Sequence, residues 1–191
     1  MEVRVATERD IDGITATLTA AFEADPLWSW AFPREGLADL WRMLVSSALR
    51  YSWVWVADDY AAASVWIPPT GTELTEAEEA SLGPMLDGLV GSRAAEILTL
   101  FERLDDTHPD GPPHYYLSLL GTHPGHRGKG LGMALLADNL ARIDSEGMPA
   151  YLESSNPAND RRYERLGFVR VGEFQRPDGR LTCSTMWREA C

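Results

Sequence analysis

The chain has 191 residues, 45% of them hydrophobic and 24% charged, with a formal net charge of -12. A chain of this length buries roughly two-thirds of its unfolded surface, enough for one domain with a core and a pocket. Its negative charge repels nucleic acid phosphates and favours cationic small partners. Its longest apolar run is too short to cross a bilayer, and its amino terminus lacks the apolar core of a secretory signal, so we expect a cytoplasmic protein with no nucleic-acid or membrane partner.

The cysteines and histidines do not suggest a metal. The two cysteines, Cys183 and Cys191, offer neither a disulfide framework nor metal-ligand spacing. The histidines lack the helical i,i+4 placement and the cysteine companions of a zinc site. They are His108, His114, His123 and His126. We therefore expect chemistry that is independent of a metal.

The first third of the chain predicts two helices and a hairpin. Thr7 precedes Asp10 by three residues, as in a capping box, and apolar residues recur after it at helical spacing. Two short apolar runs flanking a turn indicate an antiparallel hairpin. The predicted elements are a strand at 3–6, a helix from Thr7 to about 25–26, an aromatic loop at 27–33, a helix at 37–50, and strands at 54–57 and 62–67.

The remaining two-thirds predict a mixed α/β domain. An acidic, mostly helical insertion at about 72–107 is interrupted at Gly83-Pro84 and Gly88 and resumes at Arg93, and it could act as a lid. We treat 1–191 as a single domain that carries this insertion. The elements predicted after it are strands at 115–120, 150–154, 168–174 and 181–187 and helices at 129–145 and 157–166.

Three glycines alternate along the turn between the strand at 115–120 and the following helix. Gly128, Gly130 and Gly132 have no side chain that would keep a ligand from backbone N–H groups. The first turn of a helix leaves several such donors unpaired beside its positive dipole end. Lys129, the only lysine of the chain, stands within this turn. Together these features predict a cradle for a pyrophosphate.

Two common phosphate-binding loops do not fit this spacing. A P-loop requires a glycine and a Ser or Thr at positions that here hold His123 and Gly130. A dinucleotide-binding fingerprint requires a glycine where the chain has Leu135. The pattern that fits is Arg-x-x-Gly-x-Gly, formed by Arg127, Gly130 and Gly132.

A second motif surrounds the short helix predicted near the carboxyl end. Asn156 suits a helix N-cap, Pro157 the first helical position, and Gly167 a left-handed C-cap. Asn159 and Tyr163 stand four residues apart and share one face of this helix. A carboxamide and a phenol are thus predicted to point toward one ligand or one neighbour.

The two motifs together resemble the GNAT superfamily of acyl-CoA N-acyltransferases. The resemblance spans nearly the whole chain and is carried by Arg127-x-x-Gly130-x-Gly132 and Asn159-x-x-x-Tyr163. The order of hairpin, helical insertion and following strands is similar to the bacterial puromycin N-acetyltransferase group. This resemblance implies a single N-acetyltransferase domain with a twisted, mixed and mainly antiparallel sheet, flanked by helices, whose fourth and fifth strands splay apart.

The resemblance also implies acetyl-CoA as the cosubstrate. Its pantetheine arm would pair with backbone groups of Leu120 and Thr122, as a missing strand would. Asn159 would contact the same arm, and Arg165 would reach the nucleotide phosphates. The residues implied to bind acetyl-CoA are Leu120, Gly121, Thr122, Arg127, Gly128, Lys129, Gly130, Leu131, Gly132, Asn159, Tyr163 and Arg165.

The implied reaction is direct attack of a neutral primary amine on the acetyl thioester, without an enzyme nucleophile. Tyr163 would protonate the departing sulfur, because a phenol with a pKa of about 10 keeps its proton at neutral pH. Glu153, at the end of the strand that faces the acetyl group, is the first candidate for the base, with a structural ion pair as the alternative. Further candidates for the base are His114, Tyr115 and Tyr116.

We expect the acceptor to be a small-molecule amine, antibiotic-like or aminonucleoside-like, held in an apolar box with a charged group. Two alternatives are a non-catalytic acyl-CoA-binding regulator and an enzyme that acetylates proteins or peptides. We expect a monomer or a homodimer. The candidate acceptor-binding residues are Trp28, Trp30, Trp66, Tyr116 and Glu153, with Asp25 or Glu23 supplying charge.

Overall fold

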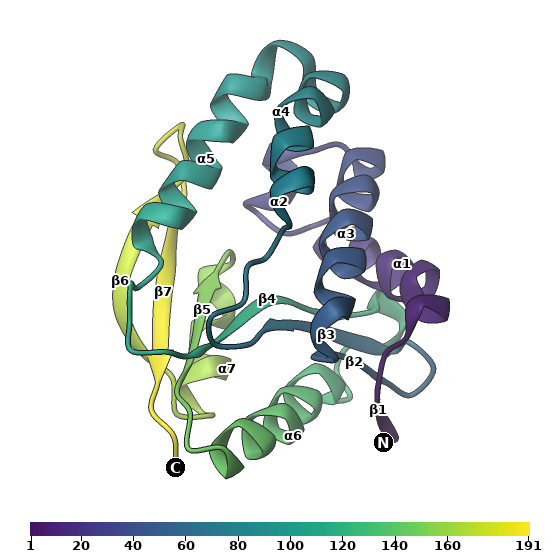
Figure 1. The fold of residues 1–191 in the computed structure, drawn as a ribbon, viewed down its shortest axis with the longest axis vertical. Helices are drawn as coiled ribbons and strands as arrows, with labels where there is room; N and C mark the ends of the chain where they lie inside the picture. The colour runs from purple at the N-terminus through teal and green to yellow at the C-terminus, as the bar shows by residue number, and fades with distance from the viewer.

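The computed structural model describes residues 1–191 and is built around one seven-stranded sheet (Figure 1). The strands are β1 (Val3–Val5), β2 (Val54–Ala57), β3 (Ala62–Ile67), β4 (Tyr115–Thr122), β5 (Ala150–Ser154), β6 (Val169–Gln175) and β7 (Thr182–Arg188). They lie in the order β1-β2-β3-β4-β5-β7-β6. All neighbours are antiparallel except β4 and β5, which run parallel, so the predicted mixed and mainly antiparallel sheet is confirmed.

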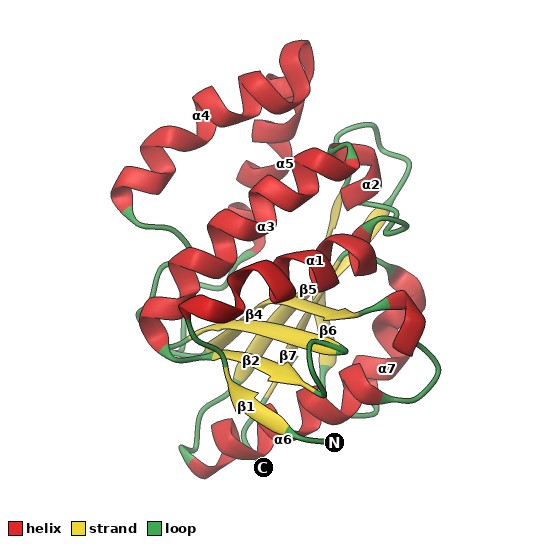
Figure 2. Cartoon of the chain, turned by 90° about the vertical axis from the view of Figure 1, so that its right-hand side faces the viewer, coloured by secondary structure: helices red, strands yellow, loops and turns green.

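Helices cover both faces of this sheet (Figure 2). The α-helices are α1 (Ile11–Phe22), α2 (Trp28–Ala31), α3 (Arg34–Ala48), α4 (Glu76–Val90), α5 (Ala94–Thr107), α6 (Leu131–Ser145) and α7 (Asp160–Glu164). α1 packs on β3 and β4 with α3 against it, whereas α6 packs on the opposite face against β2, β3 and β4. α4 and α5 form a hairpin that extends beyond α3, and α5 returns to contact β6. No helix combines the length and apolar character that a bilayer crossing requires.

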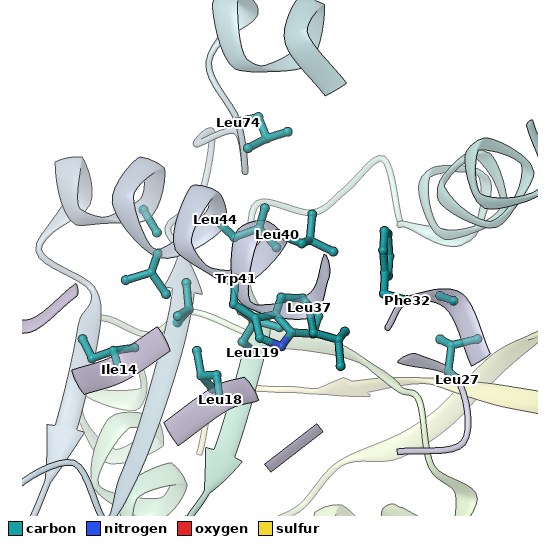
Figure 3. Packing of buried hydrophobic residues seen from close by; sticks show 14 of the residues in the cluster. Ile14, Leu18, Leu27, Phe32, Leu37, Leu40, Trp41, Leu44, Leu74 and Leu119 are labelled. Carbon is teal, nitrogen blue, oxygen red and sulfur yellow. The ribbon is translucent and has the colours of Figure 1, made fainter. Parts of the chain in front are cut away.

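The sheet separates two hydrophobic clusters. In the larger one, side chains of α1 and α3 such as Leu18 and Trp41 meet Leu119 of β4 (Figure 3). The smaller one lies under α6 and contains Trp66, whose Nε1 donates to Asn139 Oδ1 at 3.0 Å. Trp66 therefore lies away from the face that holds α1 and α3. β3 is buried along its whole length, so an alternating pattern could not assign this residue to a face.

The amino-terminal elements follow the prediction with shifted ends. The predicted capping box is present and begins a 3-10 turn that leads into α1. α1 ends at Phe22, and Asp25 Oδ1 then accepts the backbone N–H groups of Leu27 and Trp28. These bonds start the one-turn helix α2 inside the segment predicted to be only a loop, so that prediction was wrong. α3 begins at Arg34, earlier than predicted.

The helical insertion divides at a different place from the one predicted. α4 runs without interruption through Gly83 and Pro84, because the proline removes one backbone donor while the neighbouring bonds of the helix are kept. The break falls at Gly91, where φ is +56°, and it separates α4 from α5. The two helices form a hairpin next to α3 and the sheet, which places the insertion where it can wall a pocket.

The parallel strands β4 and β5 pair only at their beginnings. Tyr115, Tyr116 and Leu117 pair with residues 150–152, and no further pair joins the two strands. On its other side β4 carries a bulge: Val65 pairs with Leu119 and the next residue of β3 pairs with Leu117, so one residue, Ser118, has no partner. The predicted splay of the fourth and fifth strands is therefore confirmed, and the bulge lies where it begins.

Candidate active site

A pocket of about 630 Å³ lies where β4 and β5 diverge. α3 and the α1–α2 segment form one wall, and α4 and α5 form another. Leu40 and Trp41 in its lining belong to the cluster beneath α1 and α3, whereas Leu120 and Leu152 pack in or against the cluster under α6. The pocket therefore reaches through the sheet at the splay.

The pocket is acidic. Six carboxylate side chains line it together with two histidines, and no lysine or arginine does. Unbalanced carboxylates in a partly apolar cavity attract cationic ligands and disfavour anionic ones. The carboxylates are Asp25, Glu73, Glu79, Asp105, Asp110 and Glu153.

Glu73 is a pocket carboxyl whose charge is sensitive to pH near neutrality. It lies between β3 and α4 and accepts a hydrogen bond from the hydroxyl of Ser118, the bulge residue. Burial raises the pKa of Glu73 to about 7, with a further increase from the charge of Glu153, while the bond from Ser118 acts in the opposite direction. Glu73 therefore gains its negative charge as the pH rises through about 7.

Glu153 projects into the pocket from β5, one residue beyond the last pair between β4 and β5. Its side chain is 7% exposed, and His108 Nδ1 lies 3.7 Å from its Oε1. Burial raises the pKa of Tyr116 and of Tyr151, and the nearby charge of Glu153 raises both further. A phenol whose pKa is raised keeps its proton at neutral pH and so cannot accept another, which favours Glu153 over Tyr116 as the base. Tyr115 lies outside the pocket lining, in the cluster under α6.

Tyr163 lines the pocket from α7, as does Asn159 just before that helix. Its ring packs edge-on against Phe168, with 6.1 Å between ring centroids. Burial, with a smaller contribution from the charge of Asp25, raises the pKa of Tyr163 to about 12. The phenol therefore holds its proton at neutral pH and presents an O–H donor to the pocket.

The caps predicted around this short helix are present. Asn156 Oδ1 accepts the backbone N–H of Ala158 at 3.1 Å, and Gly167 has φ of +90° after the last turn. The segment begins with a 3-10 turn and continues as α7. Asn159 Oδ1 accepts from Arg162 at 3.1 Å, which leaves the amide NH₂ of Asn159 available to a ligand.

The glycine turn before α6 presents unpaired backbone donors. Gly128 and Gly130 have φ of +80° and +75°, and a Cβ built on either would meet nothing within 4 Å. The backbone N–H groups of Gly128, Lys129 and Gly130 have no acceptor within the protein, and the first turn of α6 follows directly. This donor set fits a diphosphate, which the partial positive charge of the helix terminus also favours.

Residues within the turn and in the adjacent β4 hold the turn in place. A Cβ on Gly132 would lie 2.4 Å from Thr122 Oγ1, so this glycine allows α6 to pack closely on β4. Gly121 likewise packs against Leu18 of α1. The Arg127 guanidinium donates to the carbonyl of Ala21 at 2.7 Å and so ties the turn to α1. The exposed residues of the predicted set include Arg127, Lys129 and Arg165. Leu131, at the start of α6, is partly buried.

The aromatic segment divides between the pocket and the surface around it. Trp28 lines the pocket and meets Trp41 edge-on, with ring centroids 5.0 Å apart. Trp30 lies outside the lining, with the guanidinium groups of Arg93 and Arg176 over its ring at 4.8 and 5.0 Å. The structure thus brings Trp28 together with Tyr116 and Glu153, and leaves Trp30 and Trp66 outside the pocket.

The two acidic candidates of that segment also differ. Asp25 lines the pocket, and burial raises its pKa although Ser155 donates to its Oδ2 at 2.8 Å. Glu23 is half-exposed and forms an ion pair with Arg34 outside the pocket. Asp25 also holds the start of α2, so it is partly committed to the fold.

Glu73 and His108 are among the pocket residues that the sequence analysis did not place in the site. Glu73 stands in an irregular segment after the proline stop of β3, and His108 ends the second helix of the insertion. Neither belongs to a motif or a periodic face. The only indication in the sequence was their position at the ends of an insertion expected to cover the site.

Replacing Gly130 by alanine tests the glycine turn. An alanine side chain disfavours this positive φ by about 1 kcal/mol, so the turn relaxes from the conformation that binds and the KM for acetyl-CoA should rise about fivefold. Gly147, beyond α6, has φ of +67° and equally open surroundings, which makes Gly147→Ala a matched control. Both variants should lose similar stability in urea titrations. Equal KM values in the two variants would show that the turn does not bind the cosubstrate.

Comparisons with known proteins agree with this geometry. Residues 17–168 match the model of the family described as "Acetyltransferase (GNAT) family". A solved protein of Corynebacterium glutamicum, described as histone acetyltransferase HPA2 and related acetyltransferase, superposes with a TM-score of 0.70 at 28% identity, covering 99% of this chain and 96% of that one. Drosophila melanogaster polyamine N-acetyltransferase superposes with a TM-score of 0.70 at 18% identity, covering 98% and 99% of the two chains, and so shares the fold.

One curated relative matches a shorter part of the chain. Mycothiol acetyltransferase of Streptomyces avermitilis is 42% identical over 54 residues, which are 27% of this chain and 18% of that protein. The match therefore spans less than a fifth of the relative's length.

Proposed function

Because this chain belongs to the acetyltransferase (GNAT) family, whose model matches residues 17–168, we propose that it transfers an acetyl group from acetyl-CoA to the primary amine of a small cationic molecule in the cytoplasm. The chain is an N-acetyltransferase of this family, whose members use acetyl-CoA in general. The observation that carries the proposed acceptor is the pocket at the splay of β4 and β5, which six carboxylates line without a lysine or arginine. An ammonium group complements that charge.

The cosubstrate would bind along the splay. The free N–H groups of Gly128, Lys129 and Gly130 would hold the diphosphate, and the unpaired edge of β4 at Leu120 and Thr122 would pair with the pantetheine amides. The glycine turn and the edge of β4 would be positioned by Gly121, Arg127, Leu131 and Gly132. Asn159 would contact the pantetheine arm through its amide. Arg165, exposed after α7, would pair with the nucleotide phosphates. Acetyl-CoA supplies the activated acetyl thioester.

Two residues would move the protons of the reaction. Glu153 would remove a proton from the acceptor's ammonium, so that the neutral amine can attack the acetyl carbonyl directly. Tyr163, whose pKa is raised to about 12, would protonate the departing sulfur. Cys183 is buried outside the pocket lining, and burial raises its pKa to about 12, which disfavours a covalent acyl-enzyme.

The walls favour a small acceptor over a protein segment. α4 and α5 supply Leu82, Phe101 and Leu104 to the lining, opposite Trp28 and Trp41. An amine with an apolar or extended body, such as an aminonucleoside, an arylalkylamine or a polyamine, would fill such a space. A protein acceptor would need an open groove instead.

An acceptor panel tests the proposal. Release of free thiol from acetyl-CoA would be followed with puromycin-like aminonucleosides, arylalkylamines, polyamines and lysine-containing peptides, and mass spectrometry would locate the acetyl group. We expect acetylation of a cationic small molecule at kcat/KM values of about 10⁴ M⁻¹s⁻¹ or more for a good acceptor. Faster acetylation of peptides than of every small amine would contradict the proposed acceptor class.

The charge of Glu73 predicts a pH dependence of acceptor binding. Because this carboxyl is neutral below and charged above a pKa of about 7, the KM of an acceptor that stays fully cationic should fall severalfold as the pH rises through that value. Glu73→Gln should remove this dependence. Ser118→Ala should shift its midpoint to higher pH, because it removes a bond that stabilises the charged form. A pH-dependent KM that persists in Glu73→Gln would assign the effect to another group.

A further inference from the structure

Two histidines form a line from the pocket toward the surface. His108 follows α5 and His114 precedes β4, and both line the pocket. His108 Nδ1 lies 3.7 Å from Glu153 Oε1. His108 Nε2 lies 3.1 Å from His114 Nε2, and His114 Nδ1 lies 2.7 Å from the carbonyl oxygen of Pro112. We propose that these two histidines are a proton relay that carries the proton taken from the acceptor's ammonium from Glu153 to solvent, a role that rests on the proposed amine acetylation.

The hydrogen bonds determine which ring nitrogens carry protons. A carbonyl oxygen only accepts, so His114 Nδ1 carries the proton donated to Pro112. In the neutral ring His114 Nε2 is then an acceptor, and His108 Nε2 must be the donor to it. His108 Nδ1 keeps a free lone pair on the side of Glu153. The His108 ring is therefore arranged to take a proton from the active site and to give one toward the surface.

The chemistry of amine acetylation requires such an exit. An ammonium ion and an acetyl thioester give an amide, a thiol and one free proton. The nitrogen loses two protons as the ammonium becomes an amide. The base takes one of them, and the other returns to Tyr163 in place of the proton that Tyr163 gives to the sulfur. Glu153 is 7% exposed, so its proton needs a path through neighbouring groups to reach water.

The relay balances at each step. The proton on Glu153 passes to His108 Nδ1, the proton on His108 Nε2 passes to His114 Nε2, and the proton on His114 Nδ1 leaves to water beside Pro112, which is exposed. Burial and the charge of His108 lower the pKa of His114, which favours loss of this last proton. The starting tautomers return when each partly exposed ring loses one ring proton to water and regains one on its other nitrogen, whereas transfer back along the chain would return the proton to Glu153.

The groups around the relay hold the rings without competing for the proton. Tyr116 and Tyr151 each meet His108 edge-on with ring centroids 4.9 Å apart, and Trp187 meets His114 edge-on at 5.0 Å. The raised pKa values of the two tyrosines keep them neutral. The carboxylates whose charges act on the pair are Glu73, before α4, Asp105 of α5 and Glu153 of β5. Asp110 also lines the pocket.

His114→Gln tests the relay with the fold preserved. The Gln carbonyl can accept from His108 as His114 Nε2 does, but a carboxamide does not transmit a proton. At low buffer concentration we expect kcat to fall about 10- to 100-fold, with the KM for acetyl-CoA unchanged. The rate of the variant should rise with the concentration of a small buffer that accepts the proton, whereas the wild-type rate should not. His114→Ala should regain activity with added imidazole.

A packing control separates proton transfer from support of the pocket. Trp187→Phe loosens the contact with His114 but keeps both imidazoles, so its rate should be as independent of buffer concentration as the wild-type rate. If His114→Gln has wild-type kcat at every buffer concentration, or if a folded His114→Gln is slow and no buffer restores it, the relay is wrong. A wild-type enzyme that acetylates no amine in the panel would overturn the proposed function, and the relay with it.

Discussion

Tyr163→Phe is expected to lower kcat about 10²- to 10³-fold, because the variant cannot protonate the sulfur that leaves the acetyl group. The phenylalanine ring keeps the edge-on contact with Phe168, so the fold and the pocket wall should be preserved. The loss should appear in kcat while the KM for acetyl-CoA changes little, as expected for a group that acts only in the transition state. Steady-state kinetics at saturating acetyl-CoA and acceptor measure it.

The matched control for this variant is Tyr60→Phe. The hydroxyl of Tyr60 donates to the Asp10 carboxylate at 2.7 Å, and this tyrosine lies outside the pocket. Its loss should reduce stability slightly and leave kcat unchanged. Because the pKa of Tyr163 is raised to about 12, the wild-type enzyme should keep its turnover between about pH 8 and pH 10. Unaltered turnover of Tyr163→Phe at saturating substrates would reject this residue as the acid.

Local sequence rules predicted the parts of the site that depend on neighbouring residues. The caps at Asn156 and Gly167 act within one turn of helix, and the positive φ of Gly128 and Gly130 reflects a preference of glycine itself. Such rules do not predict the parallel pairing of β4 with β5 or their splay. Strand pairing depends on contacts between distant segments, so the splay was expected only from the resemblance to a family.

The pocket interior could not be predicted in the same way. Ser118 has no strand partner because β4 gains a residue against β3, and nothing in the run of apolar residues around it marks the bulge. Glu73 reaches Ser118 from the other end of the helical insertion. His108 reaches Glu153 across 45 positions of sequence only because α5 returns to the sheet. These contacts exist only in the folded chain.

The pocket carboxylates are proposed to have two different roles. Glu153, which projects from β5 at the splay, is the proposed base, whereas Glu73 and Glu79 belong to the segment that begins the insertion and would bind the charge of the acceptor. Loss of the base lowers the rate, and loss of a binding charge raises the acceptor KM. Kinetic constants can therefore separate the two groups.

Glu153→Gln is expected to lower kcat/KM for the acceptor about 10²-fold or more at neutral pH. The carboxamide is similar in size to the carboxylate but cannot take a proton from the ammonium. The variant should then react only with the small fraction of acceptor that is already neutral, so log kcat/KM should rise with unit slope up to the pKa of the acceptor. The wild-type acidic limb, which reports the base, should be absent. A variant that keeps the wild-type limb would argue against Glu153.

Glu73→Gln is the control, because it removes a pocket charge of the same sign without removing the base. It should raise the acceptor KM and leave kcat nearly unchanged, whereas Glu153→Gln should lower kcat as well. Adding His114→Gln to Glu153→Gln should cause little further loss, since a relay without its proton donor has nothing to carry. If the losses of the two single variants multiply in the double variant, Glu153 and His114 act independently, and the base must pass its proton to solvent by another route.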